Sequence, residues 1–335
     1  MNCRLALYFF FVLFLFSSCD ELSRKISGGN DSESESKIDI SKLHFDDELA
    51  YQYIEKQCSF GPRNPGSEGH KQCADWLLLE LKKYCDTAYF QEFDAVTYDG
   101  KKYKGKNIIG KWKSKESNRI LLSAHWDTRP IADKDIKDKE KPILGANDAG
   151  SGVGVLLALL HSLEKSPVQL GIDIVFFDIE DYGQPENSGM TPMENSWCLG
   201  SQFWAKEAKA SAQRPRWGVL LDMVGGFQAT FLKEEISALY ASALQNRIWN
   251  NASTLGYSMT FLGEPCGQIT DDHFYVNTIA GIPTVDLIHC KTGGGGFADY
   301  HHTHADNMSS VDKKTLQMVG MTLLYTIWEE SKIGQ

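Results

Sequence analysis

The chain has 335 residues, of which 42% are hydrophobic and 23% are charged, and its formal net charge at pH 7 is -10. These values are typical of a globular protein long enough for one large α/β domain or two small ones, and we favour one. The acidic charge argues against a nucleic-acid partner, because such a partner requires a basic face.

The first residues have the pattern of a targeting segment. Arg4 precedes an apolar run at residues 5–16, and two serines then precede Cys19. A run this short cannot span a bilayer, so we expect a cleaved signal rather than a membrane helix. The ending resembles a bacterial lipoprotein signal peptide over residues 1–19, with a lipid anchor on Cys19. Ordinary cleavage nearby is the alternative; both predict an exported protein, periplasmic or anchored to a bacterial membrane.

Residues 20–42 are too polar to bury a core, and we expect a flexible tether that leads to a catalytic domain at residues 43–335. The chain has eight cysteines. Two lie in the signal and the other six form no CxxC pair, so a zinc ribbon is not expected. Export permits disulfides, whose pairing does not follow from the sequence.

Apolar periodicity and turn residues divide the remaining chain into alternating strands and helices. We predict helices at residues 49–58, 74–84, 155–163, 200–210, 234–255 and 313–330, and short strands at 89–93, 106–113, 119–124, 216–222 and 283–288. This alternation predicts an α/β fold, a three-layer sandwich with a central mixed, mostly parallel β-sheet flanked by helices.

One further strand, within residues 172–183, is an apolar run that stops at two adjacent carboxylates, Glu180 and Asp181. Such a run fits a strand covered on both faces. Ligands bind beyond the carboxyl ends of parallel strands. Because neighbouring side chains point in different directions, one carboxylate can hold a metal while the other acts on the substrate.

Two loops need separate interpretation. The charged stretch at residues 133–142 predicts a solvated surface loop. The glycine-rich stretch at 145–154 lacks the Lys-Ser/Thr of a phosphate-binding loop, so we expect its glycines to let the backbone pack closely around Asp148.

The polar residues at the predicted strand ends are almost all carboxylates or imidazoles. They are His125, Asp127, Asp148, Glu180, Asp181, Asp222, Asp272 and His302. Zinc binds nitrogen and oxygen ligands, and a catalytic zinc uses three protein ligands and one open position. We therefore expect three of these residues to bind zinc and the others to act as a base, a supporting network or a second metal site.

These residues stand in motifs: Gly-Pro-Arg-Asn-Pro-Gly-Ser67, His125-x-Asp127, Gly-Ala-Asn-Asp148, Phe-Phe-Asp-Ile-Glu-Asp181, Leu-Leu-Asp222 and His302-Thr-x-x-Asp306-Asn. Together they resemble the zinc-dependent M28 peptidase family, from residue 43 to the end. Within it the chain looks most like the glutaminyl-peptide cyclotransferases of the exported bacterial type. The features behind that narrower likeness are Asp272-His273, Leu-Gly-Ser201 and the His-Thr-x-x-Asp-Asn ending.

The resemblance implies a zinc aminopeptidase-like fold and a role for each matching residue. Zinc would be bound by Asp148, Asp181 and His302. Glu180 would be the general acid and base, and Asp222 and Asp272 would belong to its hydrogen-bonded network.

Two positions depart from the animal cyclases. These usually have Glu where this chain has Asp181, and Trp where it has His301. The second departure concerns the substrate pocket rather than the metal. Trp197 is the candidate for an aromatic pocket wall, with a place in the core as the alternative, and His301 either lines the pocket or faces away from it. We expect Asp127 to orient His125 behind the metal site.

The same residues support two enzymes. The first uses one zinc ion to cyclise the N-terminal glutaminyl residue of peptides or proteins to pyroglutamate, with release of ammonia. The second is an aminopeptidase with two zinc ions, one held by His125, Asp148 and Asp222 and the other by Asp148, Asp181 and His302. A binding protein without activity is a third alternative, and it would bind no zinc.

Overall fold

The computed structural model describes residues 40–332 of the chain. The predicted signal peptide, Cys19 and most of the predicted tether lie outside these residues. Ile40–Lys42, at the end of the predicted tether, form one turn of 3-10 helix before the domain. No helix within residues 40–332 is both long and apolar enough to cross a membrane.

A six-stranded sheet forms the centre of the domain, with the strand order β1-β2-β4-β3-β5-β8. The strands are β1 (Thr87–Val96), β2 (Lys102–Trp112), β3 (Arg119–His125), β4 (Gly171–Phe177), β5 (Gly218–Asp222) and β8 (Thr284–Ile288). β4, β3, β5 and β8 run parallel, whereas β1 and β2 pair antiparallel. Every residue of the four parallel strands is buried, which explains their continuous apolar runs.

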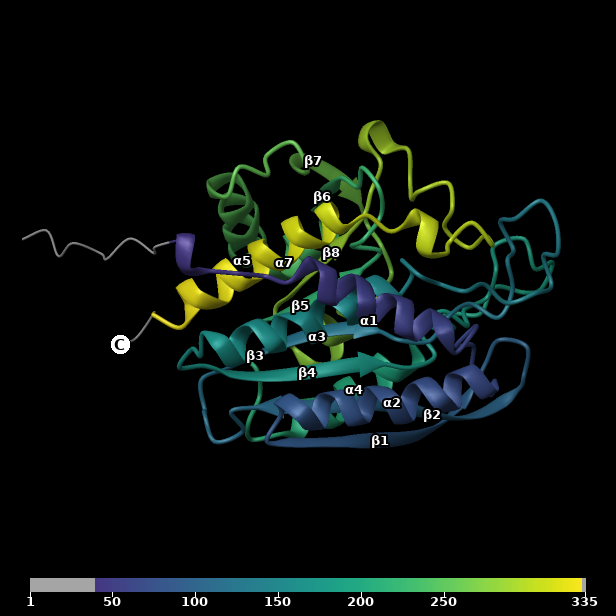
Figure 1. The fold of residues 1–335 in the computed structure, drawn as a ribbon. Coiled ribbons are helices and arrows are strands. Elements are labelled where there is room, and N and C mark those ends of the chain that lie inside the picture. The colour runs from purple at the N-terminus through teal and green to yellow at the C-terminus, as the bar shows by residue number, and fades with distance from the viewer. Residues whose placement is uncertain (1–39, 333–335) are drawn as a thin grey trace, which may run out of the picture. The chain divides into compact units, whose positions relative to one another are not determined.

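Helices cover both faces of the sheet (Figure 1). They are α1 (Asp47–Ser59), α2 (Glu68–Tyr84), α3 (Gly150–Lys165), α4 (Leu199–Ala210), α5 (Glu235–Thr254), α6 (Asp272–Tyr275), with the following π-helical turn η2 (Val276–Ala280), and α7 (Lys313–Glu330). α2 and α3 pack on one face, where α1 and α7 lie against α3. α4 and η2 pack on the other face, where Trp204 and Val276 join Leu121, Val175 and Leu220 of the sheet. The predicted three-layer α/β sandwich is confirmed.

Helix α3 depends on its glycines to approach its neighbours. A Cβ atom on Gly152 would collide with the carbonyl oxygen of Leu221, and one on Gly154 would come within 2.8 Å of the carbonyl oxygen of Ala50. Close packing therefore explains this glycine-rich stretch, as predicted. It places the start of α3, and Asp148 just before it, against the end of β5.

Several elements differ from the sequence predictions. β1 and β2 are longer than predicted, because they form a two-stranded arm whose outer residues are exposed. A separate parallel pair, β6 (Phe231–Glu234) and β7 (Phe261–Gly267), was not predicted. Strand β7 contains Gly, Glu, Pro and Cys and is mostly exposed, so it lacks the apolar run that marks a buried strand.

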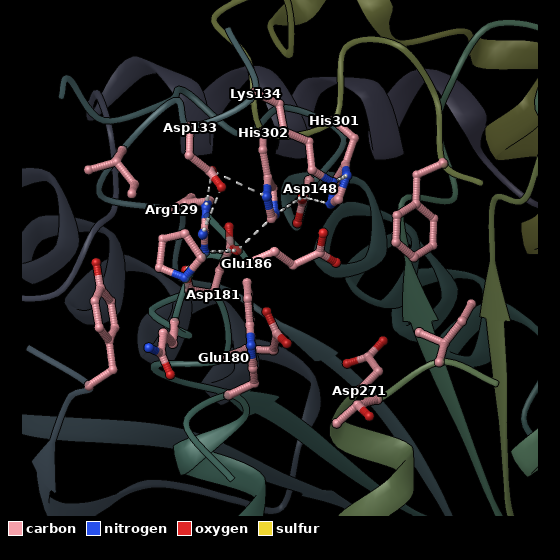
Figure 2. A pocket seen from close by; sticks show the side chains of 18 of the residues that line it. Arg129, Asp133, Lys134, Asp148, Glu180, Asp181, Glu186, Asp271, His301 and His302 are labelled. Carbon is pink, nitrogen blue, oxygen red and sulfur yellow. Dashed lines mark hydrogen bonds and ion pairs between the residues drawn. The ribbon is translucent and has the colours of Figure 1, made fainter. Parts of the chain in front are cut away.

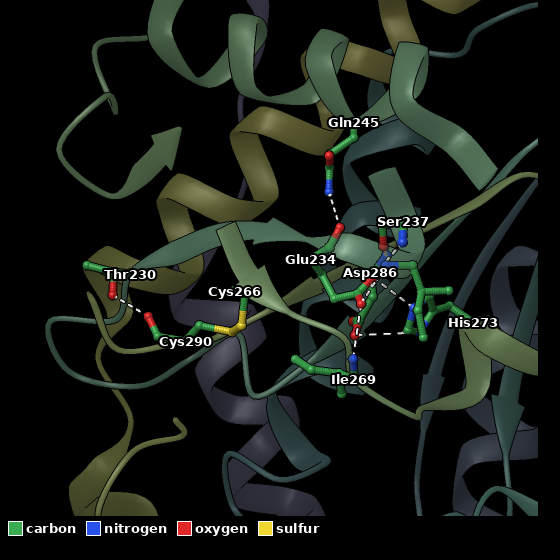
Figure 3. The surroundings of a disulfide bond; sticks show 10 residues. Thr230, Glu234, Ser237, Gln245, Cys266, Ile269, His273, Asp286 and Cys290 are labelled. Atoms are coloured by element: carbon green, nitrogen blue, oxygen red, sulfur yellow. Dashed lines mark hydrogen bonds and ion pairs between the residues drawn. A yellow bond between two sulfur atoms is a disulfide. The ribbon is translucent and has the colours of Figure 1, made fainter. Parts of the chain in front are cut away.

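A disulfide joins Cys266 in β7 to Cys290, just beyond β8 (Figure 3). The two cysteines are 24 residues apart, and closing a loop of this length stabilises a fold by about 3 kcal/mol. The bond ties together two segments that border the cavity described below, one at residues 268–271 and one at 291–302. In the described part of the chain, Cys58, Cys73, Cys85 and Cys198 are free thiols.

Candidate active site

A cavity of about 1160 Å³ opens at the carboxyl ends of the parallel strands (Figure 2). Among the residues that line it are Asp148, Glu180, Asp181, Trp197, Asp222, Asp271, His301 and His302. Asp222 is the last residue of β5, and the Glu180-Asp181 pair follows β4 after a two-residue bend. The acids predicted at strand ends thus meet at one edge of the sheet.

Of the three predicted metal ligands, His302 lies close to both others, although the cluster around it whose ligand atoms all lie within 4.8 Å of one another is Asp148, His301 and His302. Nε2 of His302 lies 3.1 Å from Oδ1 of Asp181 and 3.8 Å from Oδ2 of Asp148. Ligand atoms bound at about 2.0–2.2 Å to a tetrahedral zinc ion are about 3.3–3.6 Å apart, so the two separations lie just below and just above the range for zinc, and small shifts of the side chains would bring both into it. Oδ2 of Asp181 is buried and has no hydrogen-bond partner among residues 40–332. The donor set and this unpaired oxygen both fit a zinc ion.

A second group of possible ligands surrounds His125. Its Nε2 lies 3.0 Å from Oδ1 of Asp148 and 3.2 Å from Oδ1 of Asp222. Burial opposes protonation of His125, but the carboxylates of Asp127, Asp148 and Asp222 outweigh it and raise the pKa of the imidazole well above its ordinary value. A protonated His125 can therefore balance these carboxylates without a second metal ion.

Two buried carboxylates hold the turns that carry the predicted ligands. Asp127 accepts hydrogen bonds from the backbone N–H groups of Glu180, at 3.0 Å, and Asp181, at 3.3 Å. Its Oδ1 also lies 3.7 Å from Nδ1 of His125, and its predicted role of orienting this imidazole stays a prediction. Asp306 accepts in the same way from the N–H of Asp148, at 3.0 Å. The sequence motif contained Asp306, but its role was not predicted.

The side chain of Glu180 points into the cavity away from the predicted metal ligands. Its Oε1 accepts a hydrogen bond from the Cys198 thiol at 3.1 Å, and its Oε2 lies 3.9 Å from Nδ1 of His125. Burial raises the pKa of Glu180 well above its ordinary value; His125 opposes the shift, and the nearby carboxylate of Asp271 reinforces it. A carboxylate with a raised pKa is suited to exchange protons with a substrate.

Asp271, rather than the predicted Asp272, stands beside Glu180. Asp271 lines the cavity, and one of its carboxylate oxygens lies within 4.8 Å of a Glu180 oxygen. Asp272 is fully buried outside the described cavity lining, and neither of its carboxylate oxygens has a hydrogen-bond partner among residues 40–332. The two side chains diverge because Asp271 is the extended N-cap of α6 and Asp272 is its first residue. The predicted role of Asp272 in the network stays a prediction, and Asp271 is a second candidate for that role.

The predicted pocket residues Trp197 and His301 both line the cavity. The Trp197 ring stacks against that of His302, with centroids 6.1 Å apart and planes at 10°. A Cβ atom on Gly183 would overlap the indole ring of Trp197, so only glycine at position 183 leaves space for this side chain. His301 accepts a hydrogen bond from Lys134 at 2.8 Å. Their contact with substrate stays a prediction.

The charged loop at residues 133–142 is only partly the solvated loop we expected. Its first three residues each contact one residue of the histidine turn: Asp133 contacts His302, Lys134 contacts His301 and Asp135 contacts His304. The remainder is exposed, with Ile136 at 91%. A charged composition is the same for residues that contact another segment and for residues that face solvent. The contacts of residues 133–135 with the histidine turn were therefore not predicted.

Four residues next to the site adopt a left-handed backbone, which is unusual for residues other than glycine. They are Ile179 (φ 53°), Cys198 (φ 59°), Met223 (φ 49°) and His302 (φ 59°). Each such residue costs on the order of 1–3 kcal/mol and persists only where its surroundings hold it. Ile179 and Met223 are sequence neighbours of Glu180 and Asp222, Cys198 donates a hydrogen bond to Glu180, and His302 is itself a predicted ligand. This clustering identifies the cavity as a functional site.

Comparison with known proteins agrees with this geometry. Residues 107–327 match the family model for peptidase family M28. The chain is similar to the glutaminyl cyclase of Bacteroides thetaiotaomicron bound to N-acetylhistamine (42% identity, TM-score 0.82) and to that of Tannerella forsythia (44% identity, TM-score 0.82), in each case over 85% of this chain and 98% of the other. A Zn-dependent exopeptidase from Parabacteroides distasonis is 43% identical over the same shares, with a TM-score of 0.82.

A curated relative is more distant. Aminopeptidase YwaD of Bacillus subtilis is 25% identical over 285 residues, which are 82% of this chain. The chain spans 55% of the length of that relative.

Proposed function

The chain belongs to peptidase family M28, and on this premise we propose that it is a zinc-dependent glutaminyl cyclase. It would convert the N-terminal glutaminyl residue of peptides and proteins to pyroglutamate and release ammonia. The observation that carries the proposal is the similarity to the two glutaminyl cyclases, at 42–44% identity over 85% of the chain.

We propose one zinc ion per chain, held by Asp148, Asp181 and His302. When bound, zinc supplies a Lewis acid that polarises the γ-carbonyl of the substrate glutamine. The single-ion reading is supported by His125, whose position between Asp148 and Asp222 lets a protonated imidazole take the place of a second cation.

The other residues carry the protons. The α-amine of the substrate must be neutral to attack the γ-carbon, and Glu180 accepts the proton that it loses as the new C–N bond forms. Glu180 then returns this proton to the side-chain nitrogen, which leaves as ammonia when the C–N bond of the amide breaks. Asp222 and Asp271 lie where they can hold the amine toward the carbonyl, and ring closure needs mainly this orientation.

Apolar side chains around the cavity favour cyclisation over hydrolysis. Trp197, Ile269 and Phe297 all line it, and Ile269 and Phe297 pack against a core cluster that contains Met223. These apolar side chains would limit the access of water to the polarised carbonyl and so favour the substrate's own amine as the nucleophile.

The alternative is an aminopeptidase with two zinc ions. It is favoured by the convergence of His125, Asp148 and Asp222 within 4.8 Å of one another, and by the likeness to aminopeptidase YwaD. In that enzyme Glu180 would activate a water molecule instead of the substrate amine.

A direct test measures products and metal on the same purified protein. We expect one zinc per chain, ammonia release from a peptide that starts with Gln, and no amino acid released from a matched peptide that starts with Leu. Chelation should abolish ammonia release, and added zinc should restore it. Two zinc ions per chain together with free amino acids and no ammonia would establish the aminopeptidase instead.

We also propose that the chain is an exported lipoprotein anchored through Cys19. In a bacterial host the wild type should sediment with membranes and incorporate a palmitate analogue, whereas Cys19→Ala should lose the label and leave the membrane fraction. Cys3→Ala, within the same predicted signal, is the matched control and should keep the label. A label that persists in Cys19→Ala would contradict the anchor.

A further inference from the structure

One buried arginine connects several parts of the site. Arg129 is 1% exposed, and its guanidinium donates hydrogen bonds to both carboxylate oxygens of Asp133, at 2.5 and 3.2 Å. It also donates to the backbone oxygen of Asp181 at 2.9 Å and approaches its Oδ1 at 3.5 Å. Its carbon Cζ lies 4.7 Å from the centre of the Trp197 ring. Figure 2 shows Arg129 between Asp133 and Asp181.

Asp133 extends this connection to the histidine turn. Its Oδ1 lies 3.5 Å from Nδ1 of His302, an ion-pair distance; this nitrogen is buried and has no hydrogen-bond partner among residues 40–332, so Asp133 is the acid placed to receive its proton. The backbone N–H of Lys134 also donates to the carbonyl oxygen of His302 at 3.3 Å. Two of the three proposed metal ligands therefore contact the same pair: Asp181 contacts Arg129, and His302 contacts Asp133.

The contact at Nδ1 matters for the metal because an imidazole binds through its unprotonated nitrogen. A carboxylate at Nδ1 keeps the proton there and leaves Nε2, the atom that faces Asp148 and Asp181, free to bind. The bidentate fork between Arg129 and Asp133 fixes the direction of this carboxylate more tightly than a single hydrogen bond would.

We propose that the Arg129–Asp133 pair is a positioning element of the zinc site, which sets the tautomer of His302 and the place of Asp181 and Trp197. The inference rests on the proposed zinc ligands but not on the reaction they serve. A simple charge effect makes the opposite prediction: a buried cation 3.5 Å from a metal-binding oxygen would repel zinc, so its removal would tighten zinc binding.

The test is zinc affinity, measured by competition with a chelator on the purified protein without substrate. We expect 10–100-fold weaker binding in Arg129→Met and Asp133→Ala, at about the size seen when partners of metal ligands are removed. Asp133→Asn keeps an oxygen that can accept from Nδ1, so it should lose less than Asp133→Ala. With cobalt in place of zinc, the visible absorption spectrum should change in Arg129→Met.

Asp138→Asn is the matched control, because Asp138 lies in the same loop but is exposed and paired with Lys141. Its zinc affinity should equal that of the wild type. If Asp133→Ala and Arg129→Met bind zinc as tightly as the wild type and differ only in a lower melting temperature, the pair serves packing alone and the proposal is wrong. Tighter zinc binding in Arg129→Met would also contradict the proposal. If these variants lose zinc but the wild type releases no ammonia, the positioning role stands and the cyclase proposal fails.

Discussion

Glu180→Gln should retain zinc and lose about 10²–10⁴-fold in turnover. The glutamine side chain fills the same space and can still accept from the Cys198 thiol, but it cannot take a proton from the substrate amine. The loss should appear in kcat rather than in KM, because Glu180 acts on the proton that moves during the reaction. Ammonia release under saturating peptide and the zinc content of the same sample would measure both parts.

Asp181→Asn is the contrasting variant at the adjacent position. Its amide keeps the size of the side chain but is a poor zinc ligand, so zinc should be lost together with activity. Excess zinc should recover part of the activity in Asp181→Asn and none in Glu180→Gln. Equal loss of zinc in both variants would contradict the proposal that Asp181 binds the metal and Glu180 transfers the proton.

The position of the site could be predicted because parallel strands bring their ends together. Asp181 follows the apolar strand β4 and Asp222 ends β5, and the parallel order of an α/β sheet places such residues at one edge, whereas Asp148 lies in the loop before α3. His302 was predicted only through its motif, because no apolar strand leads directly to it. His302 has a left-handed backbone conformation, with a φ of 59°. This conformation could not be predicted, because it is usually adopted by glycine and not by histidine.

Contacts between distant segments could not be predicted from sequence in this way. Asp127 reaches the backbone of Glu180 only because β3 and β4 are neighbours in a parallel register that pairs His125 with Phe177. Arg129 was missed because a charged residue in a loop is usually solvated. The sequence does not show that residues 129–135 fold back on the histidine turn, where Arg129 is buried and paired with Asp133.

Asp271→Asn should lower kcat by about 10²-fold, whereas Asp272→Asn should leave it close to the wild type. Asp271 lines the cavity next to Glu180, and burial together with Asp222 raises its pKa to about 7, so it can share protons with the reacting groups. Asp272 lies outside the cavity lining, and burial and the neighbouring Asp271 raise the pKa of its carboxyl well above its ordinary value.

An amide has nearly the same volume as a carboxyl, and position 272 lies outside the cavity lining, so Asp272→Asn is the isosteric control for the change at 271. Melting temperatures of both variants would show that the comparison concerns folded proteins. A lower kcat in Asp272→Asn than in Asp271→Asn would support the prediction from the sequence that Asp272 belongs to the network beside Glu180. It would also mean that the side chain of Asp271, although it points into the cavity, does not act on the substrate amine, and that Glu180 and Asp222 alone hold and deprotonate it.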